Sequence, residues 1–264
     1  MSEYSFIQGG ISLYKGKVMI VTGGSNGMGK YMAKKFADEG ANVVITGRDL
    51  GRLQAAKEEI GDNASIFQMD VRDVESVQQM VNFTDEQFGR IDGLVNNAAG
   101  NFIVRAEELS PNGWKSVIDI VLNGTFYCSS AVGKYWIEKK HQGTILNMLA
   151  TYAWDAGAGV VHSAAAKAGV MSLTRTLAVE WGTQYGIRVN GIAPGPIERT
   201  GGADKLWESE EAAKRTLASI PLGRIGQPEE IAELAAFIMS DKASFMNGEI
   251  VTLDGGQWLN KSPF

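Results

Sequence analysis

The sequence predicts an α/β protein built on one doubly wound parallel sheet of about seven strands, with helices on both faces. Short β-branched apolar runs alternate with longer amphipathic segments from residue 17 onward. Such runs are typical of strands buried on both faces, as in parallel sheets. No internal repeat or linker-like change in composition divides the chain, so we expect one domain over residues 1–264.

The first half of the chain is expected to supply four strands and three helices. Asp49 stands directly before an amphipathic run, where a carboxylate can cap the helix N-terminus. The expected strands are 17–22, 42–46, 65–69 and 91–96, and the expected helices are 29–40, 49–60 and 73–88.

The second half continues the alternation. Long helices are expected over roughly 112–140 and 163–185, strands over 144–148, 187–192 and 249–253, and a helix over 228–240. The stretch 194–210 is rich in proline and glycine, and irregular segments of that length are often functional. We expect it to form a substrate lid, and residues 1–16 to form an N-terminal extension.

Composition excludes several classes of function. The net charge of −5 provides no broad basic surface for nucleic acid or anionic lipid. Cys128 is the only cysteine, so no internal disulfide can form, and no cluster of metal ligands stands out. The N-terminus lacks the apolar core of a signal peptide, and no apolar run is long enough to span a bilayer. We therefore expect a cytoplasmic protein without metal, nucleic acid or membrane partners.

A glycine-rich turn follows the first expected strand and precedes the first helix. Glycines in this position let the backbone approach a pyrophosphate, and the helix N-terminus supplies N–H donors and a positive dipole end. An ordinary strand–helix turn is the alternative, but the strand–turn–helix context favours a dinucleotide. The candidate cofactor residues are Thr22, Gly23, Ser25, Asn26, Gly27, Met28 and Gly29.

The residue after the second strand selects between the two nicotinamide cofactors. An NAD site has an acidic group there for the ribose hydroxyl, whereas this chain has Thr46-Gly47-Arg48. The guanidinium of Arg48 suits a 2′-phosphate, so NADP(H) is the expected cofactor. Asp49 opposes this assignment unless it caps the helix, and Arg48 as a solvated surface residue is the alternative.

Three segments together resemble the short-chain dehydrogenase/reductase family, which has a Rossmann-type fold. They are the glycine-rich turn, Asn96-Asn-Ala-Ala-Gly100 after the fourth strand, and Pro194-Gly195 after the sixth. The resemblance implies an adenosine side lined by Asn96, Ala98 and Gly100, an adenine held by Asp70 and Val71, and a nicotinamide passed by residues 194–197. It adds these cofactor candidates: Asp70, Val71, Asn97, Ala98, Ala99, Gly100, Lys167, Pro194, Gly195 and Ile197.

The chain departs from that family at its catalytic position. The family has a tyrosine four residues before a lysine on the helix after the fifth strand, but here Ser163 precedes Lys167. An aliphatic alcohol is a far weaker acid than a phenol, so a serine cannot simply substitute. Tyr152, just past the fifth strand, is one replacement. His162 is another, although it points about 100° away from the Ser163–Lys167 face of a helix.

This rearrangement resembles the NADPH-dependent 2,4-dienoyl-CoA reductases of the same family. Matching segments include Asn96-Asn-Ala-Ala-Gly-Asn-Phe-Ile103, Asp119-Ile-Val-Leu-Asn-Gly-Thr125 and Ser163-Ala-Ala-Ala-Lys-Ala-Gly169. The resemblance implies that Tyr152 and Asn101 hold the thioester oxygen and that Lys167 binds the nicotinamide ribose. It also implies that Ser163 is an auxiliary hydrogen-bonding residue and that Asn123 bonds backbone and a water near the lysine.

The chemistry of a dienoyl thioester gives this arrangement a reason. Hydride added at the far end of the conjugated system pushes charge onto the thioester oxygen, so the site must aim donors at that oxygen. The hydroxyl of Tyr152 and the amide of Asn101 are suitable donors. Protonation then occurs at carbon, and the acid of a ketone reductase is not required.

Several of these residues have plainer alternative roles. Tyr152 could only pack at a strand end, Asn101 could cap the next helix, and Ser163 could cap its own helix. His162 is expected to be structural rather than a proton donor. Arg199 and Lys205, on or near the lid, could meet CoA phosphates or be solvated. Trp154 and Trp207 could line an acyl tunnel or be core residues.

Three functions remain in competition. The leading hypothesis is an NADPH-dependent 2,4-dienoyl-CoA reductase that produces an enoyl-CoA in the β-oxidation of unsaturated fatty acids, with an acyl-CoA thioester as substrate. The second is a 3-oxoacyl or ketone reductase using Tyr152 or His162 as acid. The third is a non-catalytic NADP-binding scaffold, against which the retained Asn101 and Lys167 argue. The family resemblance also implies a homotetramer.

Overall fold

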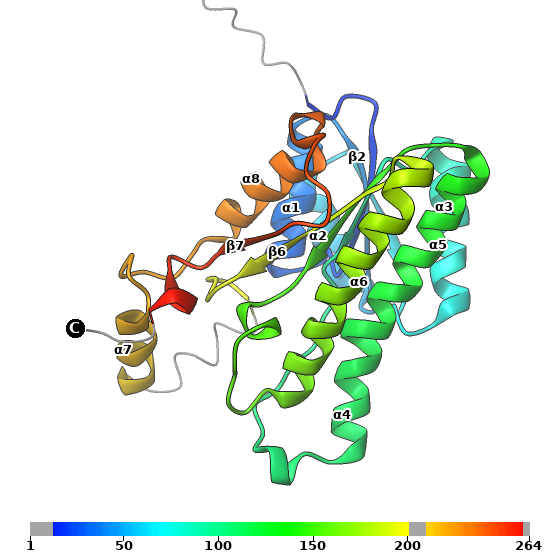
Figure 1. The fold of residues 1–264 in the computed structure, drawn as a ribbon. Coiled ribbons are helices and arrows are strands. Elements are labelled where there is room, and N and C mark those ends of the chain that lie inside the picture. The colour runs from blue at the N-terminus through cyan, green and yellow to red at the C-terminus, as the bar shows by residue number, and fades with distance from the viewer. Residues whose placement is uncertain (1–12, 201–209, 261–264) are drawn as a thin grey trace, which may run out of the picture.

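The computed structural model, which describes residues 13–200 and 210–260, contains a seven-stranded sheet in which every pair of neighbours is parallel (Figure 1). The strand order is β3-β2-β1-β4-β5-β6-β7. This is the doubly wound sheet that the sequence predicts. The strands are β1 Val18–Thr22, β2 Asn42–Gly47, β3 Ala64–Gln68, β4 Gly93–Asn96, β5 Thr144–Met148, β6 Arg188–Pro194 and β7 Ile250–Leu253.

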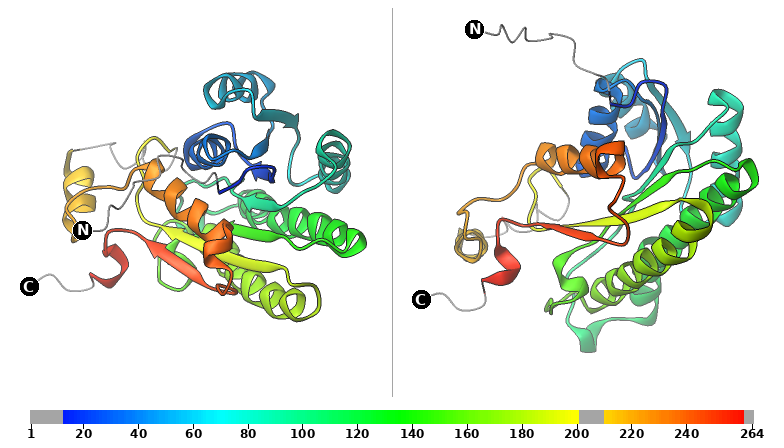
Figure 2. Two further views of the ribbon diagram at one scale, coloured as in Figure 1. Left: turned by 90° about the horizontal axis from the view of Figure 1, so that it is seen from above. Right: turned by 45° about the horizontal axis from the view of Figure 1, so that its top comes forward.

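Helices cover both faces of the sheet (Figure 2). One apolar core joins the sheet to α1, α2 and α8, and a second joins it to α3, α5 and α6. A third, smaller cluster lies between α4 and α6, beside the ends of β5 and β6. The helices are α1 Gly27–Asp38, α2 Leu50–Ile60, α3 Val74–Phe88, α4 Pro111–Ile118, α5 Gly124–Lys139, α6 Val161–Tyr185, α7 Glu210–Ser219 and α8 Pro228–Met239.

The expected helix over 112–140 is confirmed as continuous helical backbone over 111–139, but one turn in it is not α-helical. A π-helical turn, Asp119–Asn123, separates α4 from α5. The apolar spacing continues through this turn, which is why the pattern indicated one helix. Helix α7 was not expected at all. Asp49 caps α2 as predicted, because its side chain accepts from the backbone N–H of Arg52 at 3.0 Å.

Parts of two expected segments lie outside the described residues: 1–12 of the extension and 201–209 of the lid. In the described part of the chain, no helix is both long enough and apolar enough to cross a membrane.

The strand order reverses direction between β1 and β4, and this reversal positions the site. Chain segments leaving two such strands turn to opposite faces of the sheet and leave a crevice at the carboxyl edge. Here the glycine-rich turn after β1 lies beside the segment after β4. Thr22 joins them, because its hydroxyl oxygen accepts from the backbone N–H groups of Asn97 and Ala98, each at 3.0 Å.

The core beneath α5 yields a stability prediction. Trp136 is fully buried, and its indole N–H donates to the carbonyl of Ile91 at 2.7 Å. Trp136→Ala should lower the free energy of unfolding by about 3–5 kcal/mol, because it leaves a large cavity and an unpaired carbonyl. Val74→Ala, at a side chain 58% exposed on α3, is the control. Urea unfolding of both variants measures the difference, and equal losses would contradict the prediction.

Candidate active site

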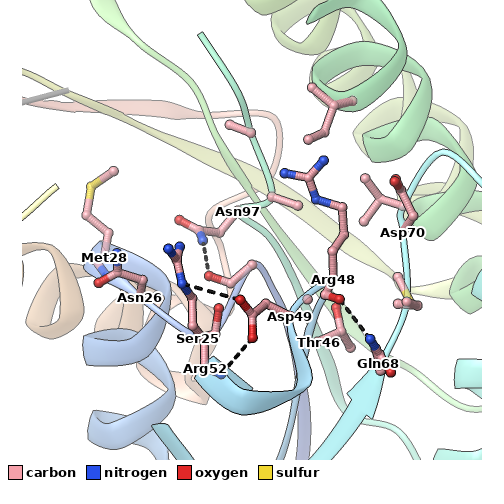
Figure 3. Close-up of a pocket in the computed structure, with 18 of the residues that line it drawn as sticks. Ser25, Asn26, Met28, Thr46, Arg48, Asp49, Arg52, Gln68, Asp70 and Asn97 are labelled. Atoms are coloured by element: carbon pink, nitrogen blue, oxygen red, sulfur yellow. Dashed lines mark hydrogen bonds and ion pairs between the residues drawn. The ribbon is translucent and has the colours of Figure 1, made fainter. Parts of the chain in front are cut away.

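A cleft with a volume of about 760 Å³ opens at the carboxyl ends of β1, β2, β3 and β4 (Figure 3). Most of the predicted cofactor residues line it: Gly23, Ser25, Asn26, Gly27, Met28, Arg48, Asp70, Val71, Asn97, Ala98 and Ala99. Sequence reasoning did not assign Thr46, Gly47, Asp49, Leu50, Arg52, Gln68, Met69, Ile120 and Thr200 to this lining.

The glycine-rich turn is shaped by close backbone packing. Gly23 and Gly27 have φ of +63° and +50°, a region that favours glycine. A Cβ on Gly29 would lie only 2.4 Å from the carbonyl oxygen of Gly23 and 2.4 Å from the amide nitrogen of Asn97. Asn26 caps α1 by accepting from the N–H of Gly27 at 2.7 Å. The N-terminus of α1 therefore points its dipole into a cleft whose floor is backbone.

The side chain of Asn97 acts on the protein's own backbone. Its amide nitrogen donates to the carbonyls of Thr22 and Gly23 at 3.1 and 3.0 Å. These two hydrogen bonds tie the glycine-rich turn to the end of β4. Asn97 lines the cleft, but its amide nitrogen is engaged in holding the turn. The spacing of the residues in the sequence gave no sign of this brace.

The far end of the cleft carries charged side chains from the segment between β2 and α2, from α2 and from the segment after β3 (Figure 3). Arg48 lines it, and its carbonyl accepts from the side-chain amide of Gln68 at 2.8 Å. Asp49 is engaged at the N-terminus of α2, as a helix cap. Asp70 pairs with Arg72 at 2.6 Å, and this guanidinium lowers the pKa of Asp70 below its usual range. Both carboxylates therefore have partners within the protein.

Some predicted cofactor residues do not line this cleft. Thr22 and Gly29 pack within the turn against Asn97, and Gly100 follows the lining residue Ala99 in the chain. Lys167 is on α6 and contacts the end of β5. The remaining residues stand at and after the end of β6; they are Pro194, Gly195 and Ile197.

These observations fit a nicotinamide dinucleotide. The backbone floor, the helix N-terminus and the guanidinium at the far end suit a pyrophosphate and a second anionic group. Lys167 stands at the end of β5, the strand next to β4 in the sheet, so the cleft and the lysine share the carboxyl edge of the sheet.

Tyr152, the tyrosine expected past the fifth strand, contacts α6, the helix on which Ser163 stands where a tyrosine was expected. Tyr152 lies in a short 3₁₀ turn, Thr151–Ala153, directly after β5. Its hydroxyl lies 3.1 Å from the hydroxyl of Ser163. Helix α6 begins at Val161 with Val160 at the cap position, so Ser163 is in the first turn and is not the N-cap. Gly157 allows this approach, because a Cβ there would lie 3.2 Å from the Cβ of Tyr152.

Lys167 lies one helical turn beyond Ser163, on the same face of α6. It is 7% exposed, and its ammonium donates to the backbone carbonyl of Met148 at the end of β5. Burial lowers the pKa of Lys167 to about 8. A buried cation with one carbonyl partner has donor capacity left for a ligand, since an ammonium has three N–H donors.

The phenol of Tyr152 is kept neutral. Burial raises the pKa of Tyr152 above its ordinary value, and the hydrogen bond to Ser163 opposes this only in part. Burial is the larger of these two causes, so the net shift is upward. A neutral phenol is a hydrogen-bond donor at neutral pH and a poor acid.

Asn101 is carried on the loop after β4, which packs against the loop before α6. The N–H of Val104 donates to the carbonyl of Gly159 at 2.9 Å. Phe102 stacks edge-on against His162 on α6, with ring centroids 4.5 Å apart. The side-chain oxygen of Asn101 accepts from the N–H of Phe102 at 2.9 Å, which fixes the amide's orientation. Asn101 does not cap the helix that follows, because Ser110 does.

His162 packs as a core residue. It is fully buried, and burial lowers its pKa below the ordinary value, so the ring is neutral. Neither ring nitrogen has a hydrogen-bond partner among the described residues. Its contact is with Phe102 rather than with Tyr152, which agrees with the expected structural role.

Three other expectations have different outcomes. Asn123 donates to the carboxylate of Asp119 at 2.9 Å within the π-helical turn, rather than to backbone. Trp154 packs edge-on against Trp258, with centroids 5.9 Å apart. Lys205 and Trp207 lie outside the described residues. Among residues 13–200 and 210–260, no group of three acidic, histidine or cysteine side chains could hold a metal ion.

The chain is similar to known oxidoreductases over most of its length. A family model described as Enoyl-(Acyl carrier protein) reductase matches residues 23–257. A Bacillus subtilis protein named as a probable 2,4-dienoyl-CoA reductase, (2E)-enoyl-CoA-producing, is 64% identical over 251 residues, which cover 94% of this chain and 99% of that protein. The mouse peroxisomal 2,4-dienoyl-CoA reductase, named (3E)-enoyl-CoA-producing, is 39% identical, covering 94% of this chain and 85% of that protein.

A solved structure agrees with these sequence matches. The crystal structure of a short chain dehydrogenase from Bacillus anthracis superposes with a TM-score of 0.88 at 61% identity. The match covers 94% of this chain and 99% of that one.

The packing of the glycine-rich turn predicts a difference between two glycines. Gly29→Ala should weaken binding of a reduced nicotinamide dinucleotide at least about tenfold, roughly 1.4 kcal/mol, because its Cβ would displace the turn. Gly51→Ala should keep this affinity and stabilise α2 by up to about 1 kcal/mol. There a Cβ would meet only Asp49, at 3.4 Å. Titration of dinucleotide fluorescence tests both variants, and unchanged affinity in Gly29→Ala would disprove the assignment of this turn.

Proposed function

The chain belongs to the short-chain dehydrogenase/reductase family, and from this premise we propose that it is an NADPH-dependent 2,4-dienoyl-CoA reductase. The substrate is an acyl-CoA thioester with two conjugated double bonds, and the product is an enoyl-CoA. The reaction is an auxiliary step in the β-oxidation of unsaturated fatty acids.

One observation carries this proposal: the contact between Tyr152 and Ser163, 3.1 Å apart. It brings the phenol of Tyr152 from the end of β5 to Ser163 on α6, the position at which the chain has no tyrosine of its own. The phenol stands one helical turn from Lys167. The site therefore supplies a neutral O–H donor where the carbonyl oxygen of a substrate would lie beside the nicotinamide.

The donor set suits a dienolate better than an alkoxide. NADPH supplies a hydride to C5 of the dienoyl group when bound, and the electrons of the two double bonds shift onto the thioester oxygen. Tyr152 and Asn101 donate hydrogen bonds to that oxygen, and the raised pKa keeps the phenol from transferring its proton. Water delivers the proton to carbon. Protonation at C2 leaves a 3-enoyl product, and protonation at C4 leaves a 2-enoyl product.

Ser163 orients the phenol, and Lys167 holds the cofactor. The hydroxyl of Ser163 fixes the orientation of the phenol by sharing a hydrogen bond with it. Lys167 has N–H donors left for the nicotinamide ribose, and its charge also favours the developing oxyanion. Asn123 supports the site indirectly. Its hydrogen bond to Asp119 stabilises the π-helical turn, which packs against α6.

The cofactor assignment rests on Arg48. Asp49 caps α2 and lies 3.6 Å from Arg52, and Asp70 is paired to Arg72, so among the described residues Arg48 is the guanidinium at that end of the cleft without an ion pair. This arrangement favours NADPH over NADH. The ribose hydroxyl of NADH would gain no comparable charge-assisted bond.

We place the enzyme in the cytoplasm and propose a homotetramer. The absence of a disulfide, since Cys128 stands alone, suits a reducing compartment. Exposed apolar side chains occur on α5 and α6, where Phe126 is 48% and Val179 is 73% exposed. Burial against further copies of the chain would remove them from water.

The decisive assay compares substrates. NADPH oxidation is measured with a 2,4-dienoyl-CoA and with a 3-oxoacyl-CoA, and NADH serves as the cofactor control. We expect rapid turnover only with NADPH and the dienoyl thioester, and slow turnover with NADH. Turnover of the ketone alone would identify a carbonyl reductase, and no turnover with either substrate would favour the non-catalytic scaffold.

Removing the phenolic hydroxyl tests the donor role directly. Tyr152→Phe should lower kcat for the dienoyl-CoA by about 10²–10³, the usual cost of one oxyanion donor. NADPH affinity should not change, because the hydroxyl faces the substrate. Tyr185→Phe, on the exposed end of α6, is the matched control. A Tyr152→Phe enzyme with wild-type kcat would rule out this role.

Removing the guanidinium tests cofactor selection. Arg48→Ala should raise KM for NADPH about tenfold or more, since charge-assisted bonds contribute about 1.5–3 kcal/mol. KM for NADH should stay the same, because it lacks the phosphate. Lys57→Ala, a cation on the exposed side of α2, controls for general charge. An equal rise in both KM values would refute the assignment of Arg48.

A further inference from the structure

Arg199 has an unexpected position. It was expected near CoA phosphates or in solvent. Its guanidinium instead contacts α1 and the start of α8, two helices that share one apolar core with the sheet. It donates to the hydroxyl of Tyr31 on α1 at 2.6 Å and to the side-chain oxygen of Gln227 at 2.9 Å. It also pairs with Glu229 on α8 at 2.5 Å, and it lies over the Tyr31 ring, 4.7 Å from the centroid.

The backbone at Arg199 is also unusual. Its φ is +54°, a left-handed value that non-glycine side chains rarely adopt. Such conformations persist where surrounding contacts hold them in place. An exposed ion pair alone contributes little. Here two hydrogen bonds, an ion pair and a stacked ring converge on one head group.

The held segment crosses the glycine-rich turn. A Cβ built on Gly27 would lie 3.6 Å from the carbonyl oxygen of Arg199 and 3.6 Å from a methyl carbon of Thr200. Thr200 itself lines the cleft. On its other side the segment is anchored by backbone bonds, since Glu198 N–H donates to the carbonyl of Gly226 at 2.9 Å. The chain therefore covers the turn on which a pyrophosphate would rest.

We propose that Arg199 is a positioning residue that holds the segment after β6 across the glycine-rich turn and thereby slows release of the bound dinucleotide. The inference rests on the proposed function, because it takes NADPH as the ligand. It assigns Arg199 to cofactor retention and not to the substrate. Tyr31 and Glu229 are its anchors on α1 and α8.

Stopped-flow displacement of NADPH, followed by its fluorescence, tests this inference. Arg199→Ala should release NADPH about fivefold faster than the wild type, because effects of contact loss fall mainly on dissociation. Tyr31→Phe should shift the rate in the same direction by less, since it keeps the ring and the other partners. Lys34→Ala, which breaks an exposed pair with Asp38 on α1, should leave the rate unchanged.

Arg199→Gly separates the side chain from the backbone. Glycine accepts the left-handed φ but removes the head group, so release should be as fast as in Arg199→Ala. A wild-type rate in Arg199→Gly, or in Arg199→Ala, would overturn the role of the guanidinium. A wild-type protein that binds no NADPH would overturn the proposed cofactor as well, which distinguishes the two failures. Circular dichroism of each variant verifies that it is folded.

Discussion

The hydrogen bond between the hydroxyls of Tyr152 and Ser163 depends on where two elements of a parallel sheet end. Strand β5 delivers Tyr152 at the carboxyl edge, and α6 begins at the same edge after a short loop. Gly157 makes room for the ring, and the carbonyl of Met148, at the end of β5, accepts from Lys167. The phenol and the lysine are thus brought together by backbone geometry, although the phenol comes from outside the helix.

The electrostatics of the site follow from burial. A phenol without a cationic partner stays protonated, whereas a lysine with little solvent has its pKa lowered to about 8. Donors fixed before the reaction stabilise developing negative charge without reorganisation. A raised pKa also disfavours the phenolate, the form that would remove a proton from an alcohol substrate in the reverse reaction of a ketone reductase. This contrast is the physical reason to assign the chain to dienolate chemistry within its family.

Sequence reasoning reached the sheet, the glycine-rich turn, the Asp49 cap and the candidate donors, because each depends on local pattern or on a resemblance carried by short segments. It missed the π-helical turn at Asp119–Asn123, whose apolar spacing does not differ from that of a helix. It missed the brace of Asn97 and the contacts of Arg199, because their partners are 74–75 and up to 168 residues away. Long-range pairing of polar side chains leaves no periodic signal in a sequence.

The proposed reaction depends on Tyr152 as a neutral hydrogen-bond donor. The direct measurement is an NMR titration of the protein with tyrosine labelled by ¹³C at the ring carbon that bears the hydroxyl, with Tyr152→Phe used to assign the signal. We expect the phenol of Tyr152 to remain protonated through neutral pH and to ionise above the ordinary tyrosine value of about 10. Ionisation near neutrality would contradict the account, because it would identify a phenol poised to give up its proton.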